Sequence, residues 1–222
     1  MKLHIELLSE ATFGRGDGIT GYVDQEIEYD AATGLPFIRG RTIKGLLVEE
    51  CANIFYVLGN SVQELTKAAQ FLFGSPGSGL ESQAGMHIGA ARMPNDLRQA
   101  ILYAVREEKS LRADEVLATL TDLRRQTAVD HSSGVPDDGS LRTMRVLRRG
   151  IALQADITFN RELTSLERAL LSACVAAWRR GGTGRNRGRG RLKAYLDSPA
   201  QQAKYLKQFQ EMSQNGTGGD DA

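Results

Sequence analysis

The stretch from residue 181 to residue 191, GGTGRNRGRGR, is the sequence feature that most limits how this chain can fold. It holds five glycines and four arginines, with no acidic and no apolar side chain. Glycine permits positive φ angles and close approach of another chain, and the guanidinium group of arginine matches phosphate and stacks on nucleobases. Such a loop can therefore contact a polyanion through side chains and backbone amides. A disordered Arg/Gly linker is the alternative interpretation.

Ordered elements are expected on both sides of this segment, which we call the glycine–arginine loop. Thr164 and Glu167 have the spacing of a capping box, and an apolar helical stripe follows as far as Trp178. Residues 192–196 alternate apolar and polar side chains, as a half-buried strand does. The expected unit is a helix, the loop and a strand, and this favours an ordered loop over a linker.

Charge is distributed unevenly along the chain, although the formal net charge is only +1. Residues 1–30 carry seven acidic side chains, whereas residues 179–193 carry seven basic ones and no acid. A basic cluster of this kind is typical of a surface that binds nucleic acid.

The two cysteines, Cys51 and Cys174, fall on apolar helical faces, which predicts buried free thiols. Neither a leader peptide nor a long apolar run is present, so we expect a cytoplasmic protein with no membrane partner.

Acidic residues gather near the N-terminus. If residues 22–29 are extended, Asp24, Glu26 and Glu28 share one face. They form either a solvated strand face or a metal or acid–base site. Just before them, the glycines at 16, 18 and 21 have dinucleotide-binding spacing, but the strand and helix of that motif are missing on either side.

A helix is expected from Thr42, its predicted N-cap, to residue 58. Arg39, Arg41 and Lys44 cluster at its start, where free amides and the helix dipole favour phosphate. An exposed cap decorated with bases is the alternative.

A long hairpin is predicted from residues 126–129 and 141–147, with its tip at 132–140. Its stems are basic and suit a finger laid against nucleic acid. The stem arginines are Arg124, Arg125, Arg142, Arg145, Arg148 and Arg149. His131, near the tip, is a conceivable general base.

The order of expected elements, without insertions, is β-α-β-β-α-β, which predicts an α+β fold with a ferredoxin-like (RRM-like) core. We expect one domain over residues 1–197, with a helical insertion at about 94–123 and the projecting hairpin thumb at about 124–149. Residues 198–222 would form a C-terminal helix and a flexible tail.

Several motifs occur in an order that is similar to a known family. They are Gly21-Tyr-Val-Asp24, Asp30-x-x-Thr-Gly-Leu-Pro-Phe-Ile38, Gly40-Arg-Thr-Ile-Lys-Gly45, Leu72-Phe-Gly-Ser-Pro76, Gly139-Ser-Leu-Arg142 with Gly150 beyond it, and the glycine–arginine loop. Together they resemble the RAMP superfamily, and within it the backbone subunits of type III CRISPR–Cas effector complexes. Where relatives commonly have Pro-Gly-Ser-Ser, this chain has the sequence RGRT at 39–42.

The resemblance implies a subunit that holds CRISPR RNA in a basic groove beside other RAMP subunits. Its thumb would displace a nucleotide of the guide–target duplex. Asp24 would be the catalytic residue and metal ligand that cuts target RNA with Mg²⁺ or another divalent cation, and Asp30 would have a structural role. The residues expected to bind RNA are Arg15, Arg39, Arg41, Thr42, Lys44, Arg142, Arg145, Arg185, Arg187 and Arg189.

Two alternatives remain open at the level of sequence. The first is an architectural subunit that binds guide RNA without cutting. The second is an endoribonuclease that processes precursor RNA without metal, using His131 or His4.

Overall fold

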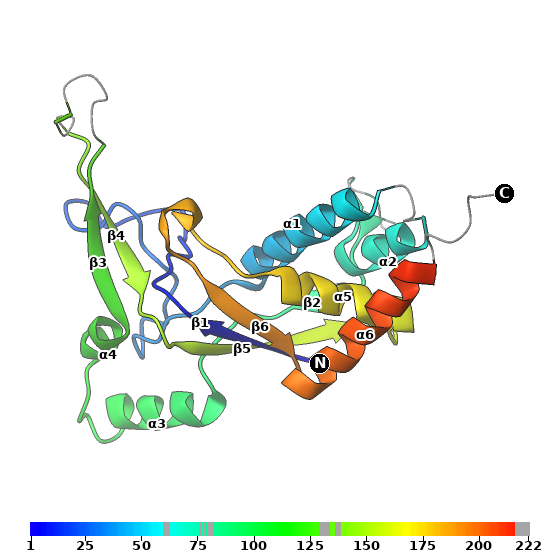
Figure 1. Ribbon diagram of the computed structural model, residues 1–222. Coiled ribbons are helices and arrows are strands. Elements are labelled where there is room, and N and C mark those ends of the chain that lie inside the picture. The colour runs from blue at the N-terminus through cyan, green and yellow to red at the C-terminus, as the bar shows by residue number, and fades with distance from the viewer. Residues whose placement is uncertain are drawn as a thin grey trace.

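The computed structural model describes residues 1–59, 63–75, 77, 79, 82–128, 134–135 and 139–215. It is a mixed α+β structure with its hairpin standing away from the body at one end (Figure 1). In chain order, its elements are β1 Lys2–Leu7, α1 Gly40–Leu58, α2 Gln63–Phe73, β2 Met86–Ile88, α3 Asn95–Arg106, α4 Ala113–Leu120, β3 Thr121–Gln126, β4 Arg142–Leu147, β5 Ala152–Phe159, α5 Ser165–Ala177, β6 Leu192–Leu196 and α6 Pro199–Asn215.

The main sheet has the strand order β2-β5-β1-β6, and each neighbouring pair is antiparallel. In chain order these strands, with α1 and α5 between them, give β-α-β-β-α-β. The first strand lies between the third and the fourth, which is the ferredoxin-like arrangement. The predicted fold class is therefore confirmed.

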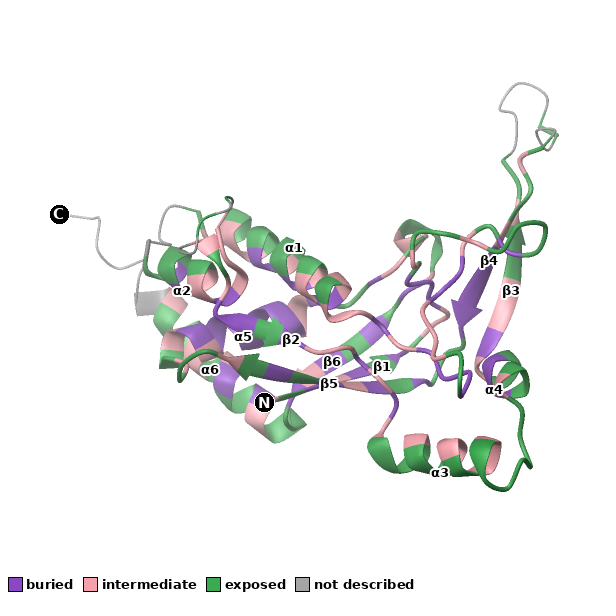
Figure 2. Cartoon of the chain, turned by 180° about the vertical axis from the view of Figure 1, so that it is seen from behind, coloured by how far each residue is buried: buried purple, intermediate pink, exposed green. Residues whose placement is uncertain are grey.

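One face of this sheet forms the core with the helices. Leu3, Ile5 and Leu7 of β1 are buried, as the period of two requires, and they pack in one cluster with apolar residues of α1 and α5. The alternate residues of β1 are less buried, and burial varies in this way along the strands of the sheet (Figure 2). Among these residues is His4, whose ring stacks on that of Tyr195 at 4.8 Å. The predicted capping box of α5 is present, with Thr164 Oγ1 accepting from the Glu167 amide at 3.2 Å.

The projecting hairpin is a separate two-stranded sheet of β3 and β4. It begins earlier than predicted, because α4 ends at Leu120 and the chain turns extended at Thr121. The Thr121 hydroxyl donates a hydrogen bond of 2.7 Å to the Leu117 carbonyl, and so gives a partner to one of the last carbonyl groups of α4. The predicted helix to residue 123 was therefore too long, and the pairing runs from Thr121–Leu147 to Gln126–Arg142.

The start of α1 also differs from the prediction. Arg39, not Thr42, is the N-cap residue, and no side chain caps this end. The reason is a close approach to β2, because a Cβ on Gly40 would lie 1.8 Å from the Ile88 carbonyl oxygen. Only glycine fits there, so the helix begins at residue 40 and Thr42 is already inside its first turn.

Residues 22–29 do not form the expected strand, and Asp24, Glu26 and Glu28 do not share a solvated face. This segment makes only isolated bridges, among them one from Gln25 to Met144. Glu26 is fully buried, whereas Asp24 is exposed. Glu26 is turned inward because its carboxylate pairs with the buried Arg145. The next helix starts only at Gly40, which also leaves the dinucleotide motif without its helix.

The C-terminal helix is present as α6 and packs on α5 and β6. Residues 216–222, His131 and most of the hairpin tip lie outside the described residues, so the predicted flexible tail stays a prediction. Within the described ranges, no helix combines the length and the apolar character needed to cross a bilayer.

Candidate nucleic-acid interface

The glycine–arginine loop is an ordered turn that joins α5 to β6. Its two ends pair with each other, since the Gly181 amide donates to the Gly190 carbonyl at 2.9 Å. Gly190 has φ +72°, and a Cβ there would lie 1.9 Å from the Gly181 carbonyl oxygen. This close approach requires glycine. The alternative of a disordered linker is thereby excluded.

Three side-chain contacts tie this loop to separate parts of the molecule. Arg185 binds both carboxylate oxygens of Glu49 on α1, at 3.0 and 2.9 Å. The Gln25 amide donates to Thr183 Oγ1 at 3.1 Å. Arg189 donates to Met144 Sδ at 2.8 Å and, with the Gln126 amide oxygen turned toward it, to that oxygen at 3.0 and 3.2 Å. The guanidinium groups of Arg185 and Arg189 are therefore both engaged by other groups of the protein.

Arg187 is different from these two arginines. Its guanidinium makes no hydrogen bond or ion pair within the part of the chain that the structure describes. It is exposed on a 3₁₀ turn, Arg185–Arg187, that is flanked by glycines in the left-handed region. Arg187 is thus available to a ligand.

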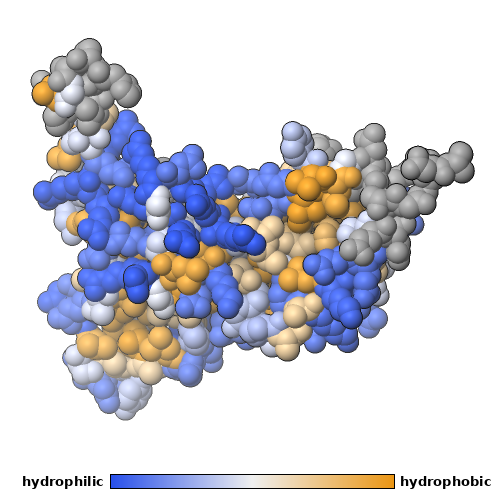
Figure 3. Space-filling view, viewed as in Figure 1, coloured by the Kyte–Doolittle hydropathy of each residue, from blue (hydrophilic) through white to orange (hydrophobic). Residues whose placement is uncertain are grey.

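Arg187 lies where two hollows meet between the hairpin and the body. The first, of about 720 Å³, is lined by the acids Asp17 and Asp24 and by the bases Arg142 and Arg187, among other residues. The second, of about 970 Å³, is lined by residues 182–187 of the glycine–arginine loop, by Arg179 and Arg180, and by the acids Glu49 and Glu50. The two share Gln126, Met144, Thr183 and Arg187, so they form one groove, which we call the thumb groove. Hydrophilic residues dominate this part of the surface in Figure 3.

Asp24 is fixed at the wall of the thumb groove by the backbone of β4. Its Oδ2 accepts a hydrogen bond of 2.6 Å from the Thr143 amide, and its own amide donates to the Thr143 carbonyl at 2.8 Å. Oδ1 makes no hydrogen bond within the described residues. One carboxylate oxygen is therefore held by the protein, and the other is left for a ligand beside Arg142.

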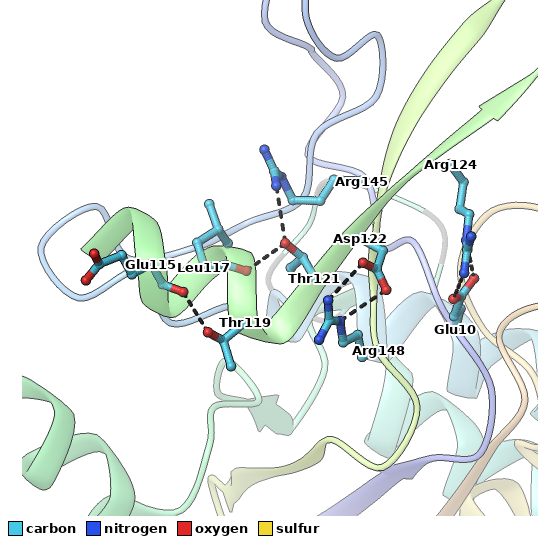
Figure 4. Close-up of polar contacts among 9 residues, drawn as sticks. All are labelled: Glu10, Glu115, Leu117, Thr119, Thr121, Asp122, Arg124, Arg145 and Arg148. Carbon is cyan, nitrogen blue, oxygen red and sulfur yellow. Dashed lines mark hydrogen bonds and ion pairs between the residues drawn. The ribbon is translucent and has the colours of Figure 1, made fainter. Parts of the chain in front are cut away.

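Three of the six stem arginines face acidic partners, and Figure 4 shows two of these pairs, both exposed, at the hairpin base. Arg124 binds Glu10 and Arg148 binds Asp122. These hydrogen bonds lower the pKa of the Glu10 and Asp122 carboxyls from their ordinary values. The stems are therefore less cationic than the count of arginines indicates, and Arg142 is the stem arginine that lines the groove.

Arg145 was expected to contact RNA, but the structure places its side chain in the interior. Its exposed fraction is 8%, and its Nε donates to Glu26 Oε1 at 2.8 Å. A second donation, from Nη1 to Thr121 Oγ1, spans 3.2 Å. Because its donors are turned inward, Arg145 acts as a structural group and not as part of an RNA surface.

The start of α1 is not part of the thumb groove. Arg39 pairs with Glu28, and Arg41 is exposed in the first turn beside half-buried Thr42. Burial lowers the pKa of Lys44. None of these residues lines either hollow, and neither does Arg15, which pairs with Asp17. Phosphate binding at this helix start stays a prediction.

A divalent cation fits this site only with help from RNA. Within the described ranges, no three acidic, histidine or cysteine side chains converge on one point. Mg²⁺, however, is often held by one or two carboxylates together with substrate phosphates and water. Asp24, with its free Oδ1, can supply such a carboxylate.

Several groove residues carry no chemical signal of their own in the sequence. Thr143, which holds Asp24, and Gln126 and Met144, which line both hollows, belong to the two strands of the hairpin, whereas Thr183 belongs to the glycine–arginine loop. Their residue types are common in hairpins and loops. Only the position of Thr143 beside Arg142, at the end of a family-like motif, could have drawn attention to it.

The chain was compared with known proteins. The family model of the RAMP superfamily matches residues 4–193. No curated protein matches the chain.

Among solved structures, the chain is similar to "Type III-B Cmr-beta Cryo-EM structure of the Apo state", with a TM-score of 0.59, 12% identity and coverage of 89% of this chain and 97% of that chain. It is also similar to "Cryo-EM structure of the Type III-B Cmr-beta bound to cognate target RNA", with a TM-score of 0.60, 11% identity and coverage of 87% and 95%. A "Type IV-B CRISPR Complex" gives a TM-score of 0.57, 15% identity and coverage of 90% of each chain. At these identities the likeness concerns the fold. With its family model spanning most of the chain and its ferredoxin-like core, the protein belongs to the RAMP superfamily.

Proposed function

We propose that this chain is a backbone subunit of a type III CRISPR–Cas interference complex, binding CRISPR RNA and cleaving target RNA through Asp24. The observation that carries the proposal is the shared lining of one hollow beside the hairpin by Asp24, Arg142 and Arg187. The neighbouring structures come from multi-subunit complexes, one of them bound to cognate target RNA. Because a type IV-B complex is among them, the assignment to type III is part of the proposal.

The thumb groove suits a polynucleotide backbone. Arg179, Arg187 and Arg142 follow one another along its two hollows, and guanidinium groups bind phosphate whatever the base. Sequence would be read by pairing between guide and target, which leaves the protein to recognise backbone and shape. CRISPR RNA, target RNA and further RAMP subunits are the proposed partners.

The chemistry proposed for Asp24 is a proton transfer at the RNA sugar. When a nucleotide is displaced from the duplex, its 2′-oxygen can lie in line with the adjacent phosphate, so positioning supplies much of the acceleration. Asp24 Oδ1, which has no hydrogen-bond partner among the described residues, accepts the 2′-hydroxyl proton as the 2′-oxygen bonds to phosphorus. The bond from phosphorus to the 5′-oxygen breaks, that oxygen takes a proton from water, and a 2′,3′-cyclic phosphate is left. Arg142 and Arg187 stabilise the charge that develops on the phosphate. A bound divalent cation would add charge neutralisation at the same phosphate.

The alternative of metal-independent precursor processing is not favoured by the position of His4. Its ring stacks on Tyr195 on the open face of the main sheet, and it does not line the thumb groove. The other candidate, His131, lies outside the described residues.

The test uses the assembled complex with its guide RNA. Asp24→Asn keeps an oxygen that can accept the Thr143 amide but removes the negative charge. We expect target cleavage at this subunit's position to be lost in Mg²⁺ while guide binding stays within about twofold. Asp17→Asn, in the same hollow, is the matched control and should cut normally, because Arg15 already holds the Asp17 carboxylate.

Full cleavage by the Asp24→Asn complex would reject the catalytic assignment and leave the architectural subunit. Cleavage that persists in chelator would instead favour a metal-independent ribonuclease.

A further inference from the structure

The buried ion pair between Glu26 and Arg145 lies directly behind Asp24. Glu26 has no exposed surface, and Arg145 is 8% exposed. The Arg145 Nε donates to Glu26 Oε1 at 2.8 Å, and the Ile27 amide donates to the same oxygen at 2.9 Å. The other oxygen, Oε2, has no hydrogen-bond partner within the described residues. Two charged groups are thus buried together, and one carboxylate oxygen of the pair lacks a hydrogen bond within the described residues.

Such a pair is a poor source of stability. Removing two charges from water costs about as much as their attraction returns, and apolar residues of similar volume usually serve as well. An unpaired buried oxygen adds a further cost. The best-attested use of a buried polar pair is to fix which segments meet and in which register.

The segment that this pair fixes is the one that carries Asp24. The Arg145 amide donates to the Gln25 carbonyl at 3.0 Å, and the amides of Asp24 and Gln25 both donate to the Thr143 carbonyl, at 2.8 and 3.2 Å. Residues 24–26 therefore lie along β4. Asp24 faces the thumb groove, whereas Glu26, two positions later, faces inward.

The same pair also connects Asp24 to the rest of the hairpin base. Arg145 Nη1 donates to Thr121 Oγ1 of β3 at 3.2 Å, and the Arg145 carbonyl accepts from the buried Thr12 hydroxyl at 2.9 Å. The Glu26 amide donates to the Asp17 carbonyl at 3.0 Å. The side chains of the pair bond to each other, to Thr121 and to the Ile27 amide, while the backbone of the same two residues bonds to Thr12 and Asp17. The ion pair therefore stands at the junction of the hairpin with the segment that carries Asp24.

We infer that Glu26 and Arg145 are positioning residues for the Asp24 carboxylate, acting through the hydrogen bond between Asp24 Oδ2 and the Thr143 amide. Neither side chain touches RNA. This inference rests on the proposed function for its effect on cleavage, but its effect on the geometry of Asp24 is independent of that function.

The experiment compares Glu26→Gln with the unaltered protein in the assembled complex. The substitution keeps the volume and a hydrogen-bond acceptor but removes the charge that holds Arg145. We expect hydrogen exchange at the Thr143 amide to become at least about tenfold faster, because its acceptor is no longer held in place. Target cleavage should fall about 100-fold, with guide affinity within about twofold.

Asp122→Asn is the matched control. It breaks the exposed ion pair with Arg148 on the same hairpin without touching the segment of Asp24, so exchange at Thr143 and cleavage should both stay unchanged. Arg145→Lys is a second variant, which keeps the charge but lacks the donor that reaches Thr121. It should also accelerate exchange at Thr143.

The two proposals fail in different ways. Unchanged exchange at Thr143 in Glu26→Gln overturns the positioning inference, whatever happens to cleavage. Normal cleavage by the Asp24→Asn complex overturns the proposed function, whatever happens to exchange. If neither Glu26→Gln nor Arg145→Lys assembles into the complex, the pair is a requirement of folding and the positioning inference is rejected.

Discussion

The side-chain amide of Gln25 donates a hydrogen bond of 3.1 Å to Thr183 Oγ1, across 158 positions of sequence. It connects the segment that carries Asp24 to the glycine–arginine loop that carries Arg187. Both Asp24 and Arg187 line the first hollow of the thumb groove. A carboxylate and a guanidinium group from opposite ends of the chain are thus held on the same surface by polar contacts between loops.

The arginines of the glycine–arginine loop should differ in their effect on RNA binding. Arg187→Ala removes a guanidinium group that has no partner among the described residues, so one phosphate contact should be lost. We expect weaker binding and a decrease of about 0.7 in the slope of log affinity against log salt. Affinity measured from low to high salt checks this.

Arg112→Ala is the control for this prediction, because that arginine binds Asp114 on α4 and does not line the groove. An Arg187→Ala slope equal to that of the control would show that Arg187 does not contact phosphate.

Two glycines of the loop should respond differently to alanine. A Cβ at Gly190 would lie 1.9 Å from the Gly181 carbonyl oxygen. A Cβ at Gly188, which has a similar φ of +78°, would meet no atom within 4 Å other than those of its chain neighbours. Gly188→Ala should therefore lower the free energy of unfolding by only about 1–2 kcal/mol, the cost of the left-handed backbone. Gly190→Ala should cost more than about 3 kcal/mol, since the loop must also open.

Urea unfolding of the two variants tests this difference. Equal losses would mean that the ends of the loop are not paired in solution.

The capping carboxylate of α5 should make stability depend on pH. A hydrogen bond from Arg161 lowers the pKa of Glu167 below its ordinary value of 4.5. A lowered pKa in the folded state stabilises the protein above pH 4.5, and this contribution disappears as the pH falls through the folded value. Because Arg161 is partly exposed, Glu167→Gln should cost about 1 kcal/mol at pH 7 and less than that at pH 3.

Denaturant unfolding at the two pH values measures this cost. Glu211→Gln alters an exposed pair with Lys207 and should change stability little at either pH. A cost for Glu167→Gln that is the same at both pH values would contradict the assignment.

The two thiols should be protected from reagents as long as the protein is folded. Cys51 and Cys174 are both buried and free, and a hydrogen bond between them lowers the pKa of Cys51. The same bond, with burial, raises the pKa of Cys174 well above its ordinary value. Alkylation of native protein should be at least about 100-fold slower than in denaturant, because it must wait for opening of the helices. Mass spectrometry of timed samples measures this, and rapid native labelling of Cys174 would contradict it.

Local patterns in the sequence predicted the framework of the fold well. Period-two alternation located β6 at residues 192–196, and the capping box located the start of α5, because these signals depend on residues a few positions apart. The prediction was wrong at Thr42, where the close approach of Gly40 to β2 sets the helix start. It was also wrong for the hairpin boundary at Thr121.

The sequence by itself determined that a glycine–arginine turn would lie between a capped helix and a strand. It also determined that the acidic cluster would lie near the N-terminus, far from this turn in the chain. Only the tertiary structure decided which charged side chains remain free. Arg185 meets Glu49, Arg145 meets Glu26, and Arg124 meets Glu10. Each partner lies more than 100 positions away, and no local spacing records such a contact. A charge that finds a partner in the folded chain becomes part of the framework. The charge of Arg187, which has no partner among the residues that the structure describes, is left for a ligand.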